Sequence, residues 1–160
     1  MDKHALIAAL CESLEAEIAR ATETAERTRA GAVHEEARPE NDKDTRALEA
    51  SYLARGQAQR VVDLQQALKL VRFMEVRAFG PDDALGISAL VHLQSDSESR
   101  WYFLAPGGGG RKLVASDDTS VDVITPEAPL GRALAGRVLG DDFVLRAGGR
   151  AVEWEIHEVR

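Results

Sequence analysis

The sequence contains little of what marks several common classes of protein. It has a single cysteine, Cys11, which excludes an internal disulfide framework and a thiolate metal cluster. No apolar run approaches the roughly 18 residues that a membrane-spanning helix needs, and the N-terminus lacks a signal-peptide core. The formal net charge of −7 argues against a general binder of DNA or of membranes, because such proteins are usually basic. We therefore expect a cytoplasmic protein with no membrane partner.

The sequence also lacks the motifs of the common enzyme classes. The glycine run 107–110 has no adjacent Lys-Ser/Thr and precedes no helix, so it favours a flexible loop over a phosphate-binding loop. The four histidines are scattered, and there is no nucleophile triad, dinucleotide fingerprint or zinc-ligand spacing. We expect no small-molecule substrate, no cofactor bound by the chain alone and no enzymatic activity of its own.

Two long segments with coiled-coil spacing fill the first half of the chain. Asp2 can cap a first helix that runs to about residue 33, and a second helix runs from about Asp44 to Phe73. The predicted seams are Ile7, Cys11, Leu14, Ile18, Ala21, Ala25, Thr28 and Ala32 in the first helix, and Ala47, Ala50, Ala54, Gln57, Val61, Leu64, Leu68 and Val71 in the second. Both seams change from large side chains to alanine toward the connection. This predicts an antiparallel hairpin with Ile7 near Val71.

The hairpin can be a projecting arm or a layer packed flat on a globular body. Alanine seams let helices approach closely but bury little apolar area, so the outer half should be slender. About 30 residues at ~1.5 Å each give a length of roughly 45 Å. Neither helix shows a convincing second apolar stripe, which favours the projecting arm.

The connection between the helices, at about residues 34–44, is dense in acids. Pro39 is expected to end the first helix, and the acids around it are Glu35, Glu36, Glu40, Asp42 and Asp44. Surface acids are usually just solvated, and the neighbouring Lys43 and Arg46 can neutralise them by simple pairing. Carboxylates are also the preferred ligands of hard divalent cations, so both interpretations stay open.

The second half changes to a strand pattern. Residues 74–84 contain a Gly-Pro-Asp-Asp turn and predict a linker. Strands are predicted at 86–93, 101–104, 112–115, 120–124, 143–146 and 151–159, with a short helix at 125–136 capped by Thr125. The sequence thus predicts an α+β protein of two domains. Residues 1–76 form an antiparallel coiled-coil hairpin, and residues 77–160 form a small, mainly antiparallel β domain with one short helix.

Two segments, residues 128–137 (APLGRALAGR) and 60–68 (RVVDLQQAL), carry a recognisable pattern. The first resembles the Ser-Pro-Ile-Ala-Arg-Ala-Leu-Ile-Gly-Lys segment of the Gre family of bacterial transcription factors. Gly140-Asp141 and Gly148-Gly149 resemble the Gly-Asp and Pro-Gly-Gly turn that follow it in the family. The second resembles the family's Arg-Ile-Ala-Glu-Leu-Glu-Asp-Lys-Leu segment at the base of its second helix. The chain is therefore identified as resembling a Gre-type elongation factor.

By this resemblance, residues 77–160 would have an FKBP-like fold without prolyl isomerase activity. This domain would dock on bacterial RNA polymerase at the rim of the secondary channel, and its polymerase-binding residues would be Pro129, Leu130, Gly131 and Arg132. The coiled coil would enter the channel and bring its tip to the catalytic centre. Contact with nascent RNA and template DNA would then be indirect, within the elongation complex, and any chemistry would belong to the polymerase.

In cleavage-competent members of the family, two tip acids in an Asp-Leu-x-Glu-Asn-Ala context help to hold a second Mg²⁺ while the polymerase hydrolyses backtracked RNA. The resemblance makes Glu40, Asp42 and Asp44 the candidate catalytic and metal-holding residues, and only within the polymerase active centre. Aligned on Arg60 without gaps, however, the family's Asp falls on Glu40 and its Glu on Lys43. A shift of one residue aligns Asp44 with the Glu but places an asparagine at the Asp.

Because neither alignment reproduces both acids, two other functions stay open. One is a secondary-channel regulator that does not stimulate cleavage and competes with cleavage factors. The other is a coiled-coil interaction module unrelated to transcription, dimeric through its alanine-rich seam.

Overall fold

The structure, a computed structural model, describes residues 1–36, 44–147 and 149–160. The chain divides into two compact units. One is Glu12–Ala67, and the other combines Met1–Cys11 with Leu68–Arg160. The ends of the helical hairpin are thus grouped with the second half of the chain. The domain boundary at residues 76 and 77 stays a prediction.

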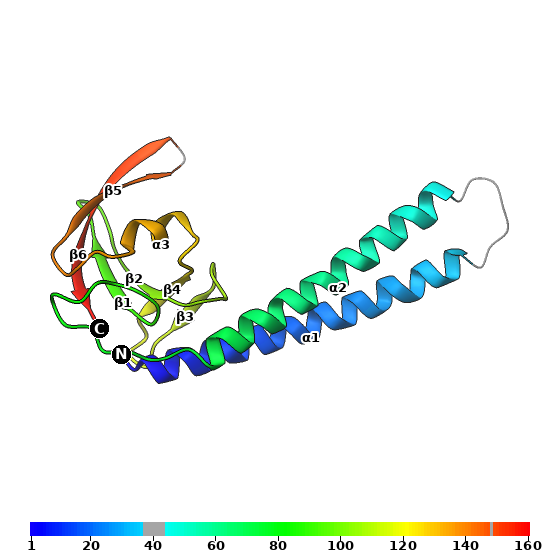
Figure 1. The fold of residues 1–160 in the computed structure, drawn as a ribbon, viewed down its shortest axis with the longest axis horizontal. Helices are drawn as coiled ribbons and strands as arrows, with labels where there is room; N and C mark the ends of the chain where they lie inside the picture. Colours follow the sequence, from blue (N-terminus) through cyan, green and yellow to red (C-terminus); the bar gives the residue numbers. More distant parts are fainter. Residues whose placement is uncertain (37–43, 148) are drawn as a thin grey trace. The chain divides into compact units, whose positions relative to one another are not determined.

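Two long helices form the first half, as predicted (Figure 1). Helix α1 spans Lys3–Glu36 and helix α2 spans Asp44–Arg72. Asp2 caps α1, because its Oδ1 accepts a hydrogen bond from the His4 backbone N–H at 2.9 Å. No helix in the described ranges combines the length and apolar character needed to cross a membrane.

The predicted seam of α2 is confirmed from residue 50 onward. Val71 is fully buried, and the other described seam residues are partly buried: Ala50, Ala54, Gln57, Val61, Leu64 and Leu68. Within the unit Glu12–Ala67, the Arg60 guanidinium donates to the Glu17 carboxylate at 2.7 Å. This pair joins the two helices in the offset that an antiparallel hairpin with Ile7 near Val71 requires. The side chains of Ala32 and Ala47 lie outside the described part of the seam.

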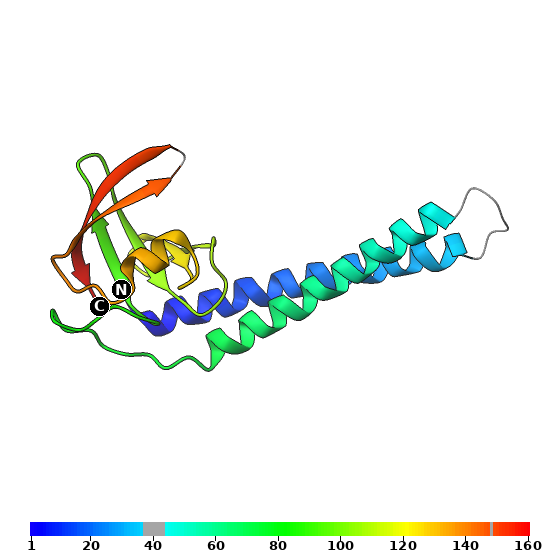
Figure 2. The ribbon, with the colours of Figure 1, turned by 45° about the horizontal axis from the view of Figure 1, so that its top comes forward.

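A six-stranded sheet forms most of the second half, in the order β3-β4-β2-β1-β6-β5. Its strands are β1 (Leu90–Gln94), β2 (Ser99–Leu104), β3 (Lys112–Val114), β4 (Ser120–Ile124), β5 (Asp142–Ala147) and β6 (Arg150–Val159). The pairings of these strands are antiparallel except for β2 with β4, which is parallel. With helix α3 (Pro129–Leu134) lying over one face (Figure 2), the predicted α+β class is confirmed.

The first strand begins later than the sequence pattern indicates. Ser88 has a positive φ of 71°, and its backbone N–H donates to the Leu104 carbonyl at 2.8 Å. Its hydroxyl is buried and accepts a hydrogen bond from the Arg77 N–H at 2.9 Å. These contacts make residues 86–89 a turn, so β1 starts at Leu90 and not at Gly86.

The sheet is apolar on both faces. On one face, Val91, Leu93, Trp154 and Ile156 belong to a core cluster that also contains Leu134 of α3. On the other face, alternate strand residues are also buried: Leu90, Phe103, Leu113, Val121 and Val123.

Residues at the start of α1 belong to the same compact unit as this second face. Leu6 and Leu10 are buried, although neither is in the predicted seam. A Cβ on Gly108, whose φ is +77°, would lie 2.9 Å from the Leu10 Cδ1 atom. The neighbouring Gly110 N–H donates to the Val123 carbonyl at 2.8 Å. The glycine run thus forms a hydrogen-bonded turn in contact with Leu10, and its flexibility stays a prediction.

The Lys3 side chain, at the start of α1, contacts Arg77 and Phe79. Its Nζ donates to the Arg77 carbonyl at 2.6 Å and lies 4.9 Å from the centre of the Phe79 ring. The Arg77 guanidinium lies 5.0 Å from the same ring. Burial, and then repulsion by Arg77, lowers the pKa of Lys3 from 10.5 to about 8.

This lowered pKa predicts a pH dependence of stability. Between about pH 8 and pH 10.5 the unfolded chain binds more protons at Lys3 than the folded chain does. The free energy of unfolding of the wild type, relative to Lys3→Met, should therefore rise with pH across this window. Urea unfolding of both proteins at about pH 7 and about pH 10 measures the change. Other titrating groups are common to both proteins and cancel in the difference. A difference that is constant or falls with pH would contradict the lowered pKa.

Candidate functional site

The acidic connection lies largely outside the described residues. This is true of Pro39, Glu40 and Asp42, which fall within 37–43. Asp44 is the first residue of α2, and only its backbone is described. Within the described ranges, no group of three or more His, Cys, Asp or Glu side chains is arranged to hold a metal ion. The catalytic and Mg²⁺-holding roles of Glu40, Asp42 and Asp44 therefore stay predictions.

The second predicted site, residues 129–132, forms helix α3. The helix begins at Pro129, whose fixed φ suits the first helical position and whose missing N–H costs nothing there. The residue before it, Ala128, provides no side-chain cap, so the predicted cap by Thr125 is wrong. The Thr125 carbonyl instead accepts the Ala128 N–H at 3.0 Å in the turn that leads into the helix. At the other end Gly136 has a φ of +78°, as a glycine that ends a helix requires.

The four residues of this predicted docking site differ in exposure. Pro129 and Arg132 are exposed, whereas Leu130 is partly buried against the core cluster. Gly131 is buried. The Arg132 Nη1 donates to the Glu127 backbone carbonyl, which holds the guanidinium group near the start of the helix. A partner can therefore contact Pro129 and Arg132 directly, while Leu130 and Gly131 set the position of the helix.

A hollow of about 600 Å³ lies beside the start of α3, and we call it the α3 hollow. Its lining residues are Arg100, Tyr102, Gly109, Gly110, Asp122, Val123, Ile124, Thr125 and Ala128. Tyr102 and Asp122 are register partners on the parallel strands β2 and β4, so their side chains stand next to each other. The hollow exists because α3 covers only part of this face of the sheet.

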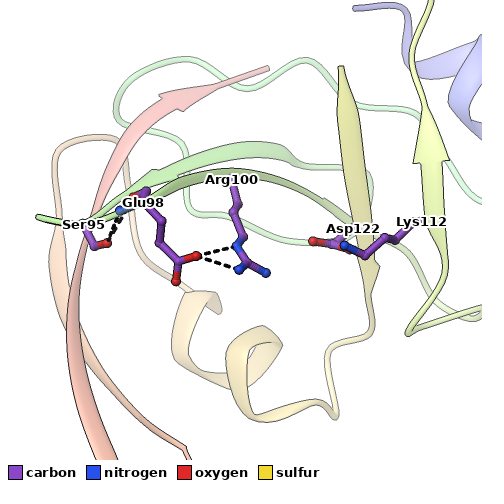
Figure 3. Close-up of polar contacts among 5 residues, drawn as sticks. All are labelled: Ser95, Glu98, Arg100, Lys112 and Asp122. Atoms are coloured by element: carbon purple, nitrogen blue, oxygen red, sulfur yellow. Dashed lines mark hydrogen bonds and ion pairs between the residues drawn. The ribbon is translucent and has the colours of Figure 1, made fainter. Parts of the chain in front are cut away.

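Two ion pairs hold the charged side chains at the rim of the α3 hollow (Figure 3). Glu98 Oε2 accepts from Arg100 Nε at 2.8 Å and from Nη2 at 2.6 Å, and the Lys112 ammonium lies 3.6 Å from Asp122 Oδ1. The bonds to Glu98 raise the pKa of Arg100, and burial raises the pKa of Tyr102.

The sequence pattern did not indicate Arg100, Tyr102 or Asp122 as site residues. The sequence did contain one indication of a polar site. Asp122 lies between Val121 and Val123, and both of these residues are buried. A carboxylate in such a strand must face a polar partner or a solvent-filled hollow. Recognising this would have required the pairing of β4 with β2, which a local pattern does not provide.

The position of α3 generates a stability prediction at Gly131. A Cβ on this residue would lie 2.0 Å from the Thr125 carbonyl oxygen and 3.0 Å from Pro126 Cα. Gly131→Ala should therefore displace the helix and lower the free energy of unfolding by about 1–3 kcal/mol. Gly86→Ala is the matched control, because a Cβ there meets nothing within 4 Å. Equal stability of the two variants in urea unfolding would contradict the close approach at Gly131.

Comparison with known proteins gives matches only among solved structures. No protein-family model matches the chain, and no curated protein matches it.

Three of the similar structures are bacterial transcription factors. The first is the GreA factor homolog 1 (Gfh1) of Thermus thermophilus, at 17% identity and a TM-score of 0.39, covering 95% of each chain. The Gfh1 of Thermus aquaticus has 16% identity and a TM-score of 0.39 over 92% of each chain. The elongation factor GreA/GreB from Nitrosomonas europaea has 22% identity and a TM-score of 0.35, over 60% of this chain and 78% of its own. Because these identities and TM-scores are low, we base the function on the residues of this chain.

Proposed function

We propose that the chain is a Gre-like transcription factor that binds bacterial RNA polymerase at the secondary channel and modulates elongation. The observation that carries the proposal is the segment 128–137, which resembles the family's sequence and forms the short helix α3 with Pro129 and Arg132 exposed. Residues of this type serve a docking surface, because a fixed proline and an arginine present shape and charge without needing a deep pocket. The chain itself would be no enzyme, and any hydrolysis would be performed by the polymerase.

The helical hairpin supports the same function. Helix α2 has 29 residues, which at 1.5 Å each correspond to roughly 44 Å. Its seam residues toward the connection are alanines, as a slender coiled coil needs. Such a hairpin suits delivery of the acidic residues around 37–43 into a narrow channel. Mg²⁺, if used, would be shared with the polymerase, because a few protein carboxylates alone hold this ion weakly.

A second candidate function is a secondary-channel regulator that does not stimulate RNA cleavage. The observation that favours it is the spacing of the acids, because the family's second acid falls on Lys43 when the chain is aligned on Arg60. An ammonium at that position opposes binding of a divalent cation by like-charge repulsion. Such a regulator would occupy the channel and compete with cleavage factors.

Docking through α3 predicts a charge-sensitive interaction with polymerase. Arg132→Glu should weaken binding to core RNA polymerase roughly tenfold or more, because reversal of a charge at an interface replaces attraction with repulsion. Arg146→Glu on β5 is the matched control, since Arg146 is also an exposed arginine on a different element. Binding is measured with labelled factor and purified core enzyme. Equal affinities of the wild type and both variants would show that α3 is not part of the interface.

The proposed role of the tip acids predicts that their loss affects RNA cleavage but not binding to polymerase. In stalled, backtracked complexes the triple variant Glu40→Gln, Asp42→Asn, Asp44→Asn should lose stimulated cleavage roughly a hundredfold while still binding polymerase, because amides cannot replace carboxylates on Mg²⁺. The control carries Gln at three exposed acids away from the connection, Glu12, Glu26 and Glu49.

The cleavage assay also separates the two candidate functions. A wild type that binds polymerase, fails to stimulate cleavage and inhibits a cleavage factor added in competition is the non-cleaving regulator. A wild type that stimulates cleavage equally well with and without the three tip acids would overturn their assignment. A wild type that does not bind polymerase would overturn both functions.

A further inference from the structure

Strands β5 and β6 continue as a two-stranded ribbon beyond the end of β1 (Figure 1). β6 pairs with β5 from Arg150 to Glu155, but its pairing with β1 begins only at Glu155, opposite Gln94. After Gln94 the chain turns away, with the Ser95 N–H donating to the Glu98 carbonyl at 2.9 Å. The edge of β6 from Ala151 to Trp154 that faces away from β5 therefore has no partner strand among the described residues.

The hydrogen-bond pattern identifies which backbone groups point to this open edge. The Ile156 N–H donates to the Asp141 carbonyl at 3.0 Å, on the side of β5. Backbone groups along a strand alternate in direction, so those of Trp154 and Val152 also point toward β5. Those of Glu155, Glu153 and Ala151 point the other way. Glu155 meets Gln94 of β1, whereas Glu153 and Ala151 face the open edge.

A hollow of about 590 Å³ lies along this edge, and we call it the edge notch. Its lining residues are Gln94, Ser95, Asp96, Ser97, Asp142, Ala151, Val152, Glu153 and Glu155. Of the lining residues that the structure describes, four are acids and none is basic. The notch thus combines free backbone donors and acceptors, a space beside them and a negative potential of one sign.

We propose that the edge notch accepts an extended, basic segment of a partner protein as an added strand, in line with β1 and antiparallel to β6. The open edge supplies the main-chain hydrogen bonds, which are independent of sequence. Its acids supply the selectivity, since Lys and Arg are the side chains that complement four carboxylates. This interaction is separate from α3 and from the tip, so it does not depend on the proposed function.

The register defines the pattern of the added segment. A residue opposite Glu153 exchanges both backbone hydrogen bonds with it and points its side chain to the same face of the sheet. That face carries Glu153, Glu155 and Asp142, whereas Val152 lies on the opposite, core-directed face. The partner segment should therefore alternate basic and apolar residues, with the amide N–H of each basic residue donating to β6.

The test uses the full chain and a fluorescein-labelled, end-capped peptide of alternating lysine and valine. Fluorescence anisotropy should show saturable binding. N-methylation of the lysine amides should weaken binding roughly tenfold or more, because it removes the bonds to β6, and N-methylation of the valine amides should not. The charge is the same in all three peptides. Equal affinities for the two methylated peptides, or no binding of the parent peptide, would overturn strand addition.

Amide exchange on the wild-type chain provides a readout that needs no variant. Binding of the lysine–valine peptide should slow hydrogen exchange at Ala151 and Glu153 and leave Val152 and Trp154 unchanged, because the latter already bond to β5. Uniform protection, or none at Ala151 and Glu153, would contradict the assigned edge.

Two double variants test the charge. Glu153→Gln with Glu155→Gln should weaken binding several-fold at low salt, and this loss should shrink as salt is added. The control Asp82→Asn with Glu127→Gln changes the same net charge at exposed acids outside the notch. Equal weakening by both pairs would show a general charge effect and would overturn the site.

Discussion

The sheet depends on being covered on both faces. Apolar residues that alternate along its strands form one set on each face. In β1, Val91 and Leu93 belong to one face and Leu90 belongs to the other. Burial of a large aliphatic side chain is worth about 1.5–3 kcal/mol, so neither set can be left in water. One set is covered by α3. The other lies in the compact unit that includes the start of α1, where Leu6 and Leu10 are buried. The first eleven residues of the chain therefore belong to the same compact unit as the sheet.

Unequal lengths of neighbouring elements explain where the surface has its two hollows. Helix α3 has 6 residues and covers only part of its face, which leaves Tyr102 and Asp122 beside the α3 hollow. β6 has 10 residues and its neighbour β1 has 5, which leaves the edge notch. Five charged strand residues line these two hollows: Arg100, Asp122, Asp142, Glu153 and Glu155. Carboxylates and guanidinium groups can lie on a largely apolar sheet only where solvent or a partner reaches them.

The sequence predicts those parts of the fold that depend on short-range patterns. The α2 seam repeats every three or four residues, and β4 alternates cleanly, so both were located correctly. The predicted start of β1 was wrong, because Ser88 adopts a positive φ and bonds with Leu104, a residue 16 positions away. Leu6 and Leu10 were missed because their burial comes from tertiary packing, which no heptad pattern reveals. The sequence placed Pro129 and Arg132 in a short helix, and their role in binding polymerase stays a prediction. The α3 hollow could not be predicted, because it depends on the parallel pairing of β2 with β4.

Insertion of the hairpin tip into a channel and binding of a metal ion at the tip require different sequence features. Delivery requires a thin, stiff support, and the alanine seam of α2 provides one whatever acids lie at the end. Chemistry requires two carboxylates held at a fixed separation around one cation, because Mg²⁺ tolerates little departure from octahedral geometry. In the sequence Lys43 stands between Asp42 and Asp44, and an ammonium group close to a metal-binding carboxylate opposes the binding of a cation. Under the proposed function, entry of the hairpin into the channel therefore does not require that its acids hold a metal ion.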